Sequence, residues 1–239
     1  MRFLEYNCIK DFVFINNFLQ LYSNGGFINM QNYEIRAMAR KQLQGKWGLA
    51  LGTFLLIQII LVGITYVGAF IGILSDVQWI AYIITIPFTP VFTLGKCRFA
   101  LNLATDKNTA NLEDIFSQFN LFFKALGLFI LQTIIIYVGL ILLIVPGIIL
   151  SFSLSQSYYV LVENPDKSII DCLKESNAIM KGYKWKLFCL YFSFIGWSLL
   201  TVLTCGIGTL WLTPYMEISM ACFYKDITKS SYDNTIEFQ

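Results

Sequence analysis

The chain has 239 residues, of which 56% are hydrophobic, 16% aromatic and only 13% charged. About a quarter of the residues in an ordinary globular protein are charged, so this composition excludes a typical soluble domain and favours a protein that lies in a lipid bilayer. The formal net charge of +2 is too small for a nucleic-acid-binding protein, and we expect no nucleic acid partner.

The types of residue that build metal sites and acid–base sites are scarce. The sequence contains no histidine, and its six cysteines are scattered without CxxC spacing. This pattern argues against His-based catalysis and against the common zinc frameworks. We therefore expect no catalytic residue, no metal and no cofactor, and we interpret the cysteines as small apolar residues or reduced thiols.

The first 29 residues contain an apolar stretch, FVFINNFLQLY, but Asn16, Asn17, Glu5 and Asp11 do not fit a signal peptide. An Asn-Gly-Gly turn then precedes a helical pattern that begins just after Met30. We expect residues 1–29 to be an N-terminal extension that is poorly ordered or not part of the native protein. Residues 30–227 would form the membrane domain, and residues 228–239 a polar tail.

Three long regions without Lys or Arg each predict a pair of membrane-spanning helices. Residues 125–162 and 187–224 are 38 residues each, which is too long for a single crossing of a core about 30 Å thick. Pro146-Gly147 and the stretch 204–208 divide these two regions, and 75–78 divides the first. The prediction is an all-α polytopic membrane protein with six transmembrane helices in three hairpins, at about 47–74, 79–95, 125–144, 148–162, 187–203 and 209–224.

All 17 Lys and Arg residues lie in the terminal segments or in the two long loops, and none lies at a hairpin tip. The positive-inside rule then places both termini and both long loops in the cytoplasm. A short amphipathic helix is expected before each hairpin, capped by Asn32, by Asn111 with Asp114, or by Ser168 with Asp171. Each would lie in the membrane interface, the alternative being an ordinary helix packed on its neighbours.

Basic and aromatic residues near the span ends are expected to contact the bilayer and its anionic lipid headgroups. They are Arg36, Arg40, Lys41, Lys46, Trp47, Lys184, Trp185 and Lys186.

An internal repeat is indicated, because the second hairpin aligns with the third at an offset of 62 residues. This offset places Lys124 on Lys186 and brings the two breaks into register. The same registers align polar stripes, each on one helix face: Thr85, Thr89 and Thr93; Gly147, Ser151 and Ser155; Thr209, Thr213 and Glu217. Two interpretations stay open, namely helix-packing surfaces joined by hydrogen bonds, or a polar path or small-ligand site. Glu217 is the main candidate for a functional residue of such a site. Placing a carboxylate near the bilayer centre costs about 2.5 to 3.5 kcal/mol and usually has a reason.

Four segments together resemble an uncharacterised bacterial family of integral membrane proteins, domain of unknown function 975. They begin EIRAMARKQLQGKWG (Glu34), VPGIILSFSLSQSYY (Val145), SNAIMKGYKWKLF (Ser176) and TCGIGTLWLTPYMEI (Thr204). The resemblance covers about residues 31–227 and implies a bacterial plasma-membrane protein. It supplies no activity and no catalytic residues.

Three classes of function are compatible with these patterns. The first is a non-enzymatic scaffold, assembly factor or envelope component that acts through a membrane protein partner or lipid. The second is a small transporter, channel or export and immunity factor that uses the polar stripes and Glu217. The third, an enzyme, is not favoured, because the cytoplasmic acids of ENPDKSIIDCLKES fit a loop, a helix cap and a solvated helix face better than an acid–base pair.

Overall fold

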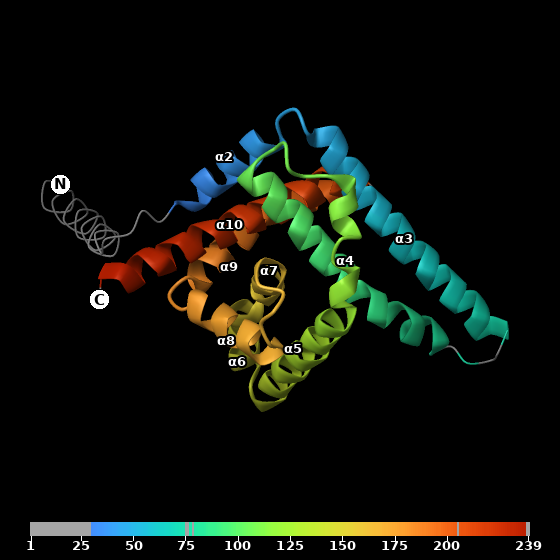
Figure 1. Cartoon of the computed structure of the whole chain (residues 1–239). Helices are drawn as coiled ribbons and strands as arrows, with labels where there is room; N and C mark the ends of the chain where they lie inside the picture. Colours follow the sequence, from blue (N-terminus) through green and yellow to red (C-terminus); the bar gives the residue numbers. More distant parts are fainter. Residues whose placement is uncertain (1–29, 75–76, 78, 205, 238–239) are drawn as a thin grey trace, which may run out of the picture.

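Helices account for nearly all of the computed structural model, which describes residues 30–74, 77, 79–204 and 206–237 (Figure 1). The prediction for residues 1–29 lies outside the described residues. Within them there are no strands, and the helices follow one another along the chain. They are α2 (Asn32–Leu43), α3 (Trp47–Leu74), α4 (Ile80–Thr105), the 3-10 turns η1 (Leu112–Ile115) and η2 (Phe119–Leu121), α5 (Phe122–Leu142), α6 (Ile144–Leu154), α7 (Ser157–Glu163), α8 (Ile169–Ile179), α9 (Lys184–Leu203) and α10 (Thr209–Glu237).

Four helical segments of the described chain are long and apolar enough to cross a membrane: Trp47–Leu74, Leu112–Leu142, Ile144–Glu163 and Lys184–Leu203. Helices α4 and α10, which we predicted as two further spans, are not among them. Both contain proline, at Pro87 and Pro90 in α4 and at Pro214 in α10, and both continue into charged sequence. The all-helical class and the apolar helices are therefore confirmed, and they are typical of a membrane protein.

The buried core lies where α4, α7 and α10 meet. Phe99 of α4, Leu161 of α7 and Phe223 of α10 are each fully buried. Helix α4 packs on both α7 and α10, and the rings of Tyr159 and Tyr224 stack at 5.2 Å between α7 and α10. Helix α2 lies along α10, and its apolar face of Ile35, Ala39 and Leu43 is fully buried against the rest of the chain. We call this packed region, formed by α2, the C-terminal part of α4, η1, α7, α8 and the C-terminal part of α10, the head.

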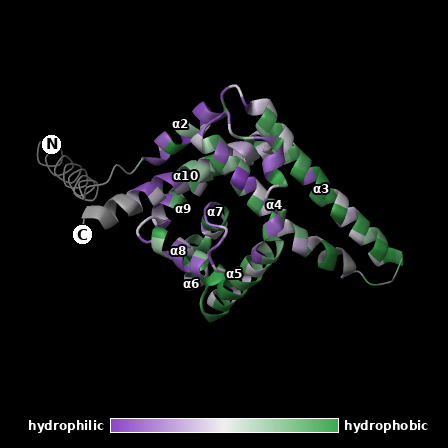
Figure 2. Cartoon of the chain, in the orientation of Figure 1, coloured by the Kyte–Doolittle hydropathy of each residue, from purple (hydrophilic) through white to green (hydrophobic). Residues whose placement is uncertain are grey.

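Apolar helices project away from the head. Helices α3 and α4 pack side by side out to one tip, and α5 and α6 pack side by side out to another (Figure 1). Of the positions in the most apolar stretch of α3, only 17% are buried, and the exposed side chains of this helix include Phe70, Ile73 and Leu74. Figure 2 shows hydrophobic residues along these projections and hydrophilic ones on α2, α8 and the C-terminal part of α10. Such exposed apolar surface is stable only when something apolar covers it.

The turn between α5 and α6 lies earlier than we predicted. The chain turns at Leu143, and Pro146 and Gly147 fall in the first turns of α6 instead of breaking the chain. Proline fits there because the first backbone N–H groups of a helix have no partner within it. A Cβ on Gly147 would lie 2.7 Å from the backbone nitrogen of Leu140, so Gly147 allows α5 and α6 to approach closely.

The helices expected before the hairpins differ in detail from the prediction. The segment after Asn111 forms η1 and η2 instead of one α-helix, although Asn111 and Asp114 do form the predicted capping box. Ser168 caps α8 as predicted, and its hydroxyl accepts the Asp171 N–H at 3.2 Å. At α2 the cap is Gln31, paired with Glu34, and the prediction of Asn32 as the cap was wrong by one residue.

Helix α10 also differs from the predicted last span. It runs from Thr209 to Glu237, so the part predicted as a polar tail is helical at least that far. Helix α9 contacts α10 over few residues, and α10 packs more extensively on α2, α4 and α3 than on its predicted hairpin partner.

Candidate functional site

The hydroxyl groups of the predicted polar stripes bond mainly within their own helices. Thr93 donates to the Thr89 carbonyl at 2.9 Å, and Thr89 donates to the Thr85 carbonyl at 3.2 Å. Ser151 and Ser155 bond to carbonyls three residues earlier, and Thr209 bonds to the Gly206 carbonyl. Thr209 and Thr213 are exposed. Bonds of this kind satisfy the hydroxyls locally and supply no direct link from one helix to the next.

Glu217 is where two of the core helices meet through charged side chains. Its Oε1 lies 3.9 Å from Nζ of Lys96 on α4, and the two side chains are 30% and 26% exposed. Sequence reasoning placed Glu217 on a polar face but did not identify Lys96 as its partner. The two residues are 121 positions apart, and no local pattern connects them.

A tyrosine pair stands beside this ion pair. The Tyr159 hydroxyl donates to the backbone carbonyl of Glu217 at 3.5 Å, and the Tyr224 hydroxyl donates to Oε2 of Glu163 at 2.8 Å. Both tyrosines are almost fully buried, and their rings stack. Sequence reasoning missed both residues. Tyr159 and Tyr224 are 65 residues apart, whereas the repeat offset is 62, so the repeat did not align one tyrosine with the other.

Lys186, predicted to contact lipid headgroups, lies instead in an internal ion pair. Its Nζ is 2.6 Å from Oδ2 of Asp226, and the two side chains are 15% and 4% exposed. Oδ1 of the same carboxylate accepts the Met30 N–H at 3.1 Å, so Asp226 joins the start of α2 to both α9 and α10. Lys186 thus has a structural partner within the chain, and its contact with lipid headgroups stays a prediction.

The other predicted lipid contacts divide between exposed and partly buried positions. Lys41 and Trp185 are exposed, whereas Arg36, Lys46, Trp47 and Lys184 are partly buried. Arg40 is exposed and donates from Nη1 to the Tyr215 hydroxyl of α10 at 3.3 Å.

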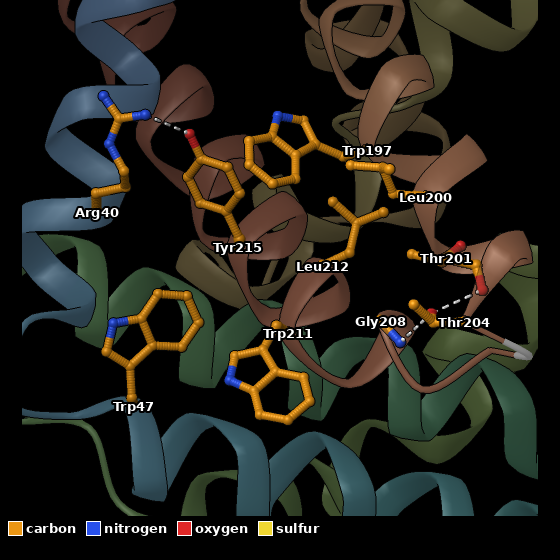
Figure 3. Close-up of a pocket in the computed structure, with 10 residues that line it drawn as sticks. All are labelled: Arg40, Trp47, Trp197, Leu200, Thr201, Thr204, Gly208, Trp211, Leu212 and Tyr215. Carbon is orange, nitrogen blue, oxygen red and sulfur yellow. Dashed lines mark hydrogen bonds between the residues drawn. The ribbon is translucent and has the colours of Figure 1, made fainter.

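Arg40 and Tyr215 form one end of a groove of about 440 Å³. Figure 3 shows Arg40 and Trp47 on one side of it and Thr201, Thr204 and Gly208 at the opposite end. Between them lie three large apolar side chains, Trp197, Trp211 and Leu212. The groove thus joins the start of α3 to the facing parts of α9 and α10, and it has one cationic end and a long apolar body.

Neither the ion pair nor the groove has the composition of a metal centre. Among the described residues, no three His, Cys, Asp or Glu side chains come together as ligands for an ion.

Comparison with known proteins yields one family. The chain matches the model of a family described as protein of unknown function (DUF975), over residues 30–145 and 128–231. No curated protein and no solved structure matches the chain.

Proposed function

The chain belongs to the family of unknown function DUF975, and we propose that it is a non-enzymatic scaffold or assembly factor of a bacterial plasma membrane. Its apolar helices lie in the bilayer and its head holds them in a fixed arrangement. The observation that carries this proposal is the contrast between a well-packed head and projections that leave their apolar flanks exposed.

The exposed flanks suit contact with lipid or with other membrane helices. Phe70 on α3 and Tyr137 on α5 are each 63% exposed, although both lie on helices long and apolar enough to cross a membrane. Within a bilayer, a transmembrane helix packs against such a surface through van der Waals contacts.

The distribution of charge supports an orientation with both termini and the head in the cytoplasm. Lys and Arg are absent from the tips of the projections and frequent in the head segments. Because cytoplasmic loops carry an excess of these residues, the tips face outside.

Two observations support the internal repeat as part of this proposal. Phe99, Leu161 and Phe223 are spaced by 62 residues, and all three are fully buried where α4, α7 and α10 meet. Gly45 and Gly182, both with positive φ, make the turns from α2 into α3 and from α8 into α9. A unit of short helix, glycine turn and apolar helix thus occurs twice.

Site-specific photocrosslinking in intact cells tests the scaffold proposal. Benzoylphenylalanine is placed at Phe70, at Tyr137, or at Tyr33, a control in the head that is 62% exposed. We expect discrete protein adducts from Phe70 or Tyr137 that the Tyr33 position does not give. Adducts with lipid alone at both projecting positions would contradict a scaffold.

A second candidate, a small ion or proton transporter, is favoured by one observation. Lys96 and Glu217 form a partly exposed ion pair, and each lies on a helix that contains proline. Proline interrupts helical hydrogen bonding and is common in transporter helices that bind ions.

Proton flux into proteoliposomes under an imposed potential tests this candidate. A transporter would lose its flux in Glu217→Gln and keep it in Glu175→Gln, a control carboxylate of α8 that pairs with Lys167. Equal flux in the wild type, both variants and empty vesicles would exclude the transporter.

A further inference from the structure

We infer that the groove between α9, α10 and the start of α3 binds one anionic phospholipid, with the phosphate at Arg40 and an acyl chain along Trp197, Trp211 and Leu212. The inference rests on the proposed placement of the apolar helices in a bilayer, and it goes further by assigning a specific lipid to a specific groove.

The position of the groove matches that of a lipid molecule. Trp47 begins α3, one of the apolar helices long enough to cross a membrane, so the Arg40 end lies where an apolar span begins. That level corresponds to the lipid headgroups, where Trp and basic residues gather. The opposite end is formed by Thr201, Thr204 and Gly208, next to the turn between α9 and α10, and the apolar side chains of the groove lie between the two ends.

The shape and size of the groove suit an acyl chain. Helices α9 and α10 contact each other over few residues, which leaves the groove between them. Trp197 and Trp211 are 56% and 53% exposed, so flat apolar surfaces face outward along it. Its volume of about 440 Å³ lies within the range of small-molecule pockets, about 300 to 1,000 Å³, which is enough for part of a lipid.

The charge at the polar end determines which headgroup fits. Arg40 is the cationic residue of the groove lining, and no carboxylate lines the groove among the described residues. A guanidinium has five N–H donors, and the bond to Tyr215 uses one of them, so the same group can also hold a phosphate. A zwitterionic headgroup would bring its own cation to this end, and an anionic phospholipid would not.

Quenching of tryptophan fluorescence by brominated lipids tests the inference on the full chain in vesicles. The chain has five tryptophans, and Trp47, Trp197 and Trp211 line the groove. Phosphatidylcholine vesicles receive increasing mole fractions of either dibrominated phosphatidylglycerol or dibrominated phosphatidylcholine. We expect the phosphatidylglycerol to reach half-maximal quenching at a mole fraction about tenfold lower, because both phosphates can accept a bond from Arg40 but only phosphatidylcholine brings a second cation close to the guanidinium.

Two matched variants locate the effect. Arg40→Gln should abolish the difference between the two lipids, whereas Lys41→Gln removes the same charge from the next residue, outside the groove lining, and should preserve it. Free glycerol phosphate should not compete, because the acyl chain is part of the ligand.

Equal quenching by the two lipids in the wild-type chain would overturn the inference without recourse to any variant. The same holds if Lys41→Gln abolishes the selectivity as fully as Arg40→Gln, or if glycerol phosphate competes. None of these results would alter membrane anchoring or the photocrosslinks from Phe70 and Tyr137, so a failure here is distinguishable from a failure of the scaffold.

Discussion

At the scale of single residues, Gly95 permits the closest approach between two segments of the head. A Cβ at this position would overlap the backbone carbonyl and Cα of Ile115 in η1. Backbone atoms cannot move aside as a flexible side chain can. Any larger residue must therefore push η1 away from α4. This movement would also displace the Ile115 side chain, which is buried.

Gly95→Ala should lower the free energy of unfolding by about 1 to 3 kcal/mol, the usual cost of overpacking. Gly63→Ala in α3 is the matched control, because a Cβ there meets nothing within 4 Å. It should be neutral or stabilising by up to about 1 kcal/mol, since alanine favours a helix more than glycine does. Both are measured by titration with sodium dodecyl sulfate in mixed micelles. Equal effects of the two variants would show that η1 does not pack on Gly95.

The ion pair of Lys186 with Asp226 gives a second prediction at this scale. Asp226→Asn removes the charge but leaves the ammonium group of Lys186 in a position only 15% exposed. Breaking a buried pair from one side costs about 3 to 5 kcal/mol. The unfolding free energy of Asp226→Asn should fall by about that amount.

A more exposed pair supplies the control. Nζ of Lys167 lies 2.5 Å from Oε2 of Glu175, and the two side chains are 35% and 26% exposed. Solvent screens such a pair, so Glu175→Gln should cost no more than about 1 kcal/mol. If Glu175→Gln costs as much as Asp226→Asn, burial is not what makes the Asp226 pair important.

Residue roles could be predicted where they depend on neighbours in the sequence. The caps formed by Asn111 with Asp114 and by Ser168 with Asp171 are confirmed because capping involves residues three apart. The partners of Lys186 and Glu217 could not be predicted. They lie 40 and 121 residues away, and only the packing of whole helices brings them together.

At the scale of elements, α2 shows that an amphipathic pattern does not specify what covers its apolar face. The pattern predicted a helix with Ile35, Met38 and Leu43 on its apolar side. The helix is confirmed with Ile35 and Leu43 on its buried side, whereas Met38 is 36% exposed. The face is buried against the chain itself, mainly on α10, as in the alternative of an ordinary helix packed on its neighbours. A single sequence cannot distinguish protein from lipid as the covering phase, because both are apolar.

Shortening one buried and one partly exposed apolar side chain of α2 to alanine tests this packing. Leu43→Ala removes a fully buried side chain and should cost about 2 to 5 kcal/mol of unfolding free energy. Met38→Ala removes one that is 36% exposed and should cost clearly less. Both are measured in the same mixed micelles. Comparable losses, or a loss confined to Met38→Ala, would mean that the buried face of α2 is assigned incorrectly.

The boundaries of elements were predicted less well than their existence. Pro146-Gly147 was interpreted as a break, but proline is tolerated in the first turn of a helix, and the chain turns at Leu143. The helix predicted after Asn111 is divided into η1 and η2, because both pack closely on other elements, with Ile115 fully buried. Tertiary contacts of this kind override local preference.

At the scale of the whole molecule, composition and charge segregation were enough to predict apolar helices joined by polar segments. Their arrangement was not predictable, since only 17% of the positions in the most apolar stretches of α3, α5 and α9 are buried, which leaves too few buried positions to distinguish one packing from another. The central claim is that the head faces the cytoplasm while the tips of the projections face outside.

Cysteine labelling tests this claim, although native Cys172 is unsuitable as a probe. It is fully buried, and burial raises the pKa of its thiol, with the neighbouring Glu175 carboxylate adding to the shift, so it reacts slowly from either side. New cysteines are therefore placed at the exposed positions Asp106, Asp166, Val145 and Val77, in a chain whose Cys8, Cys189 and Cys205 are replaced by serine.

A membrane-impermeant maleimide added to intact cells should label Val145→Cys and Val77→Cys at once, and Asp106→Cys and Asp166→Cys only after permeabilisation. Labelling of Asp106→Cys or Asp166→Cys in intact cells, with Val145→Cys and Val77→Cys protected, would contradict the account.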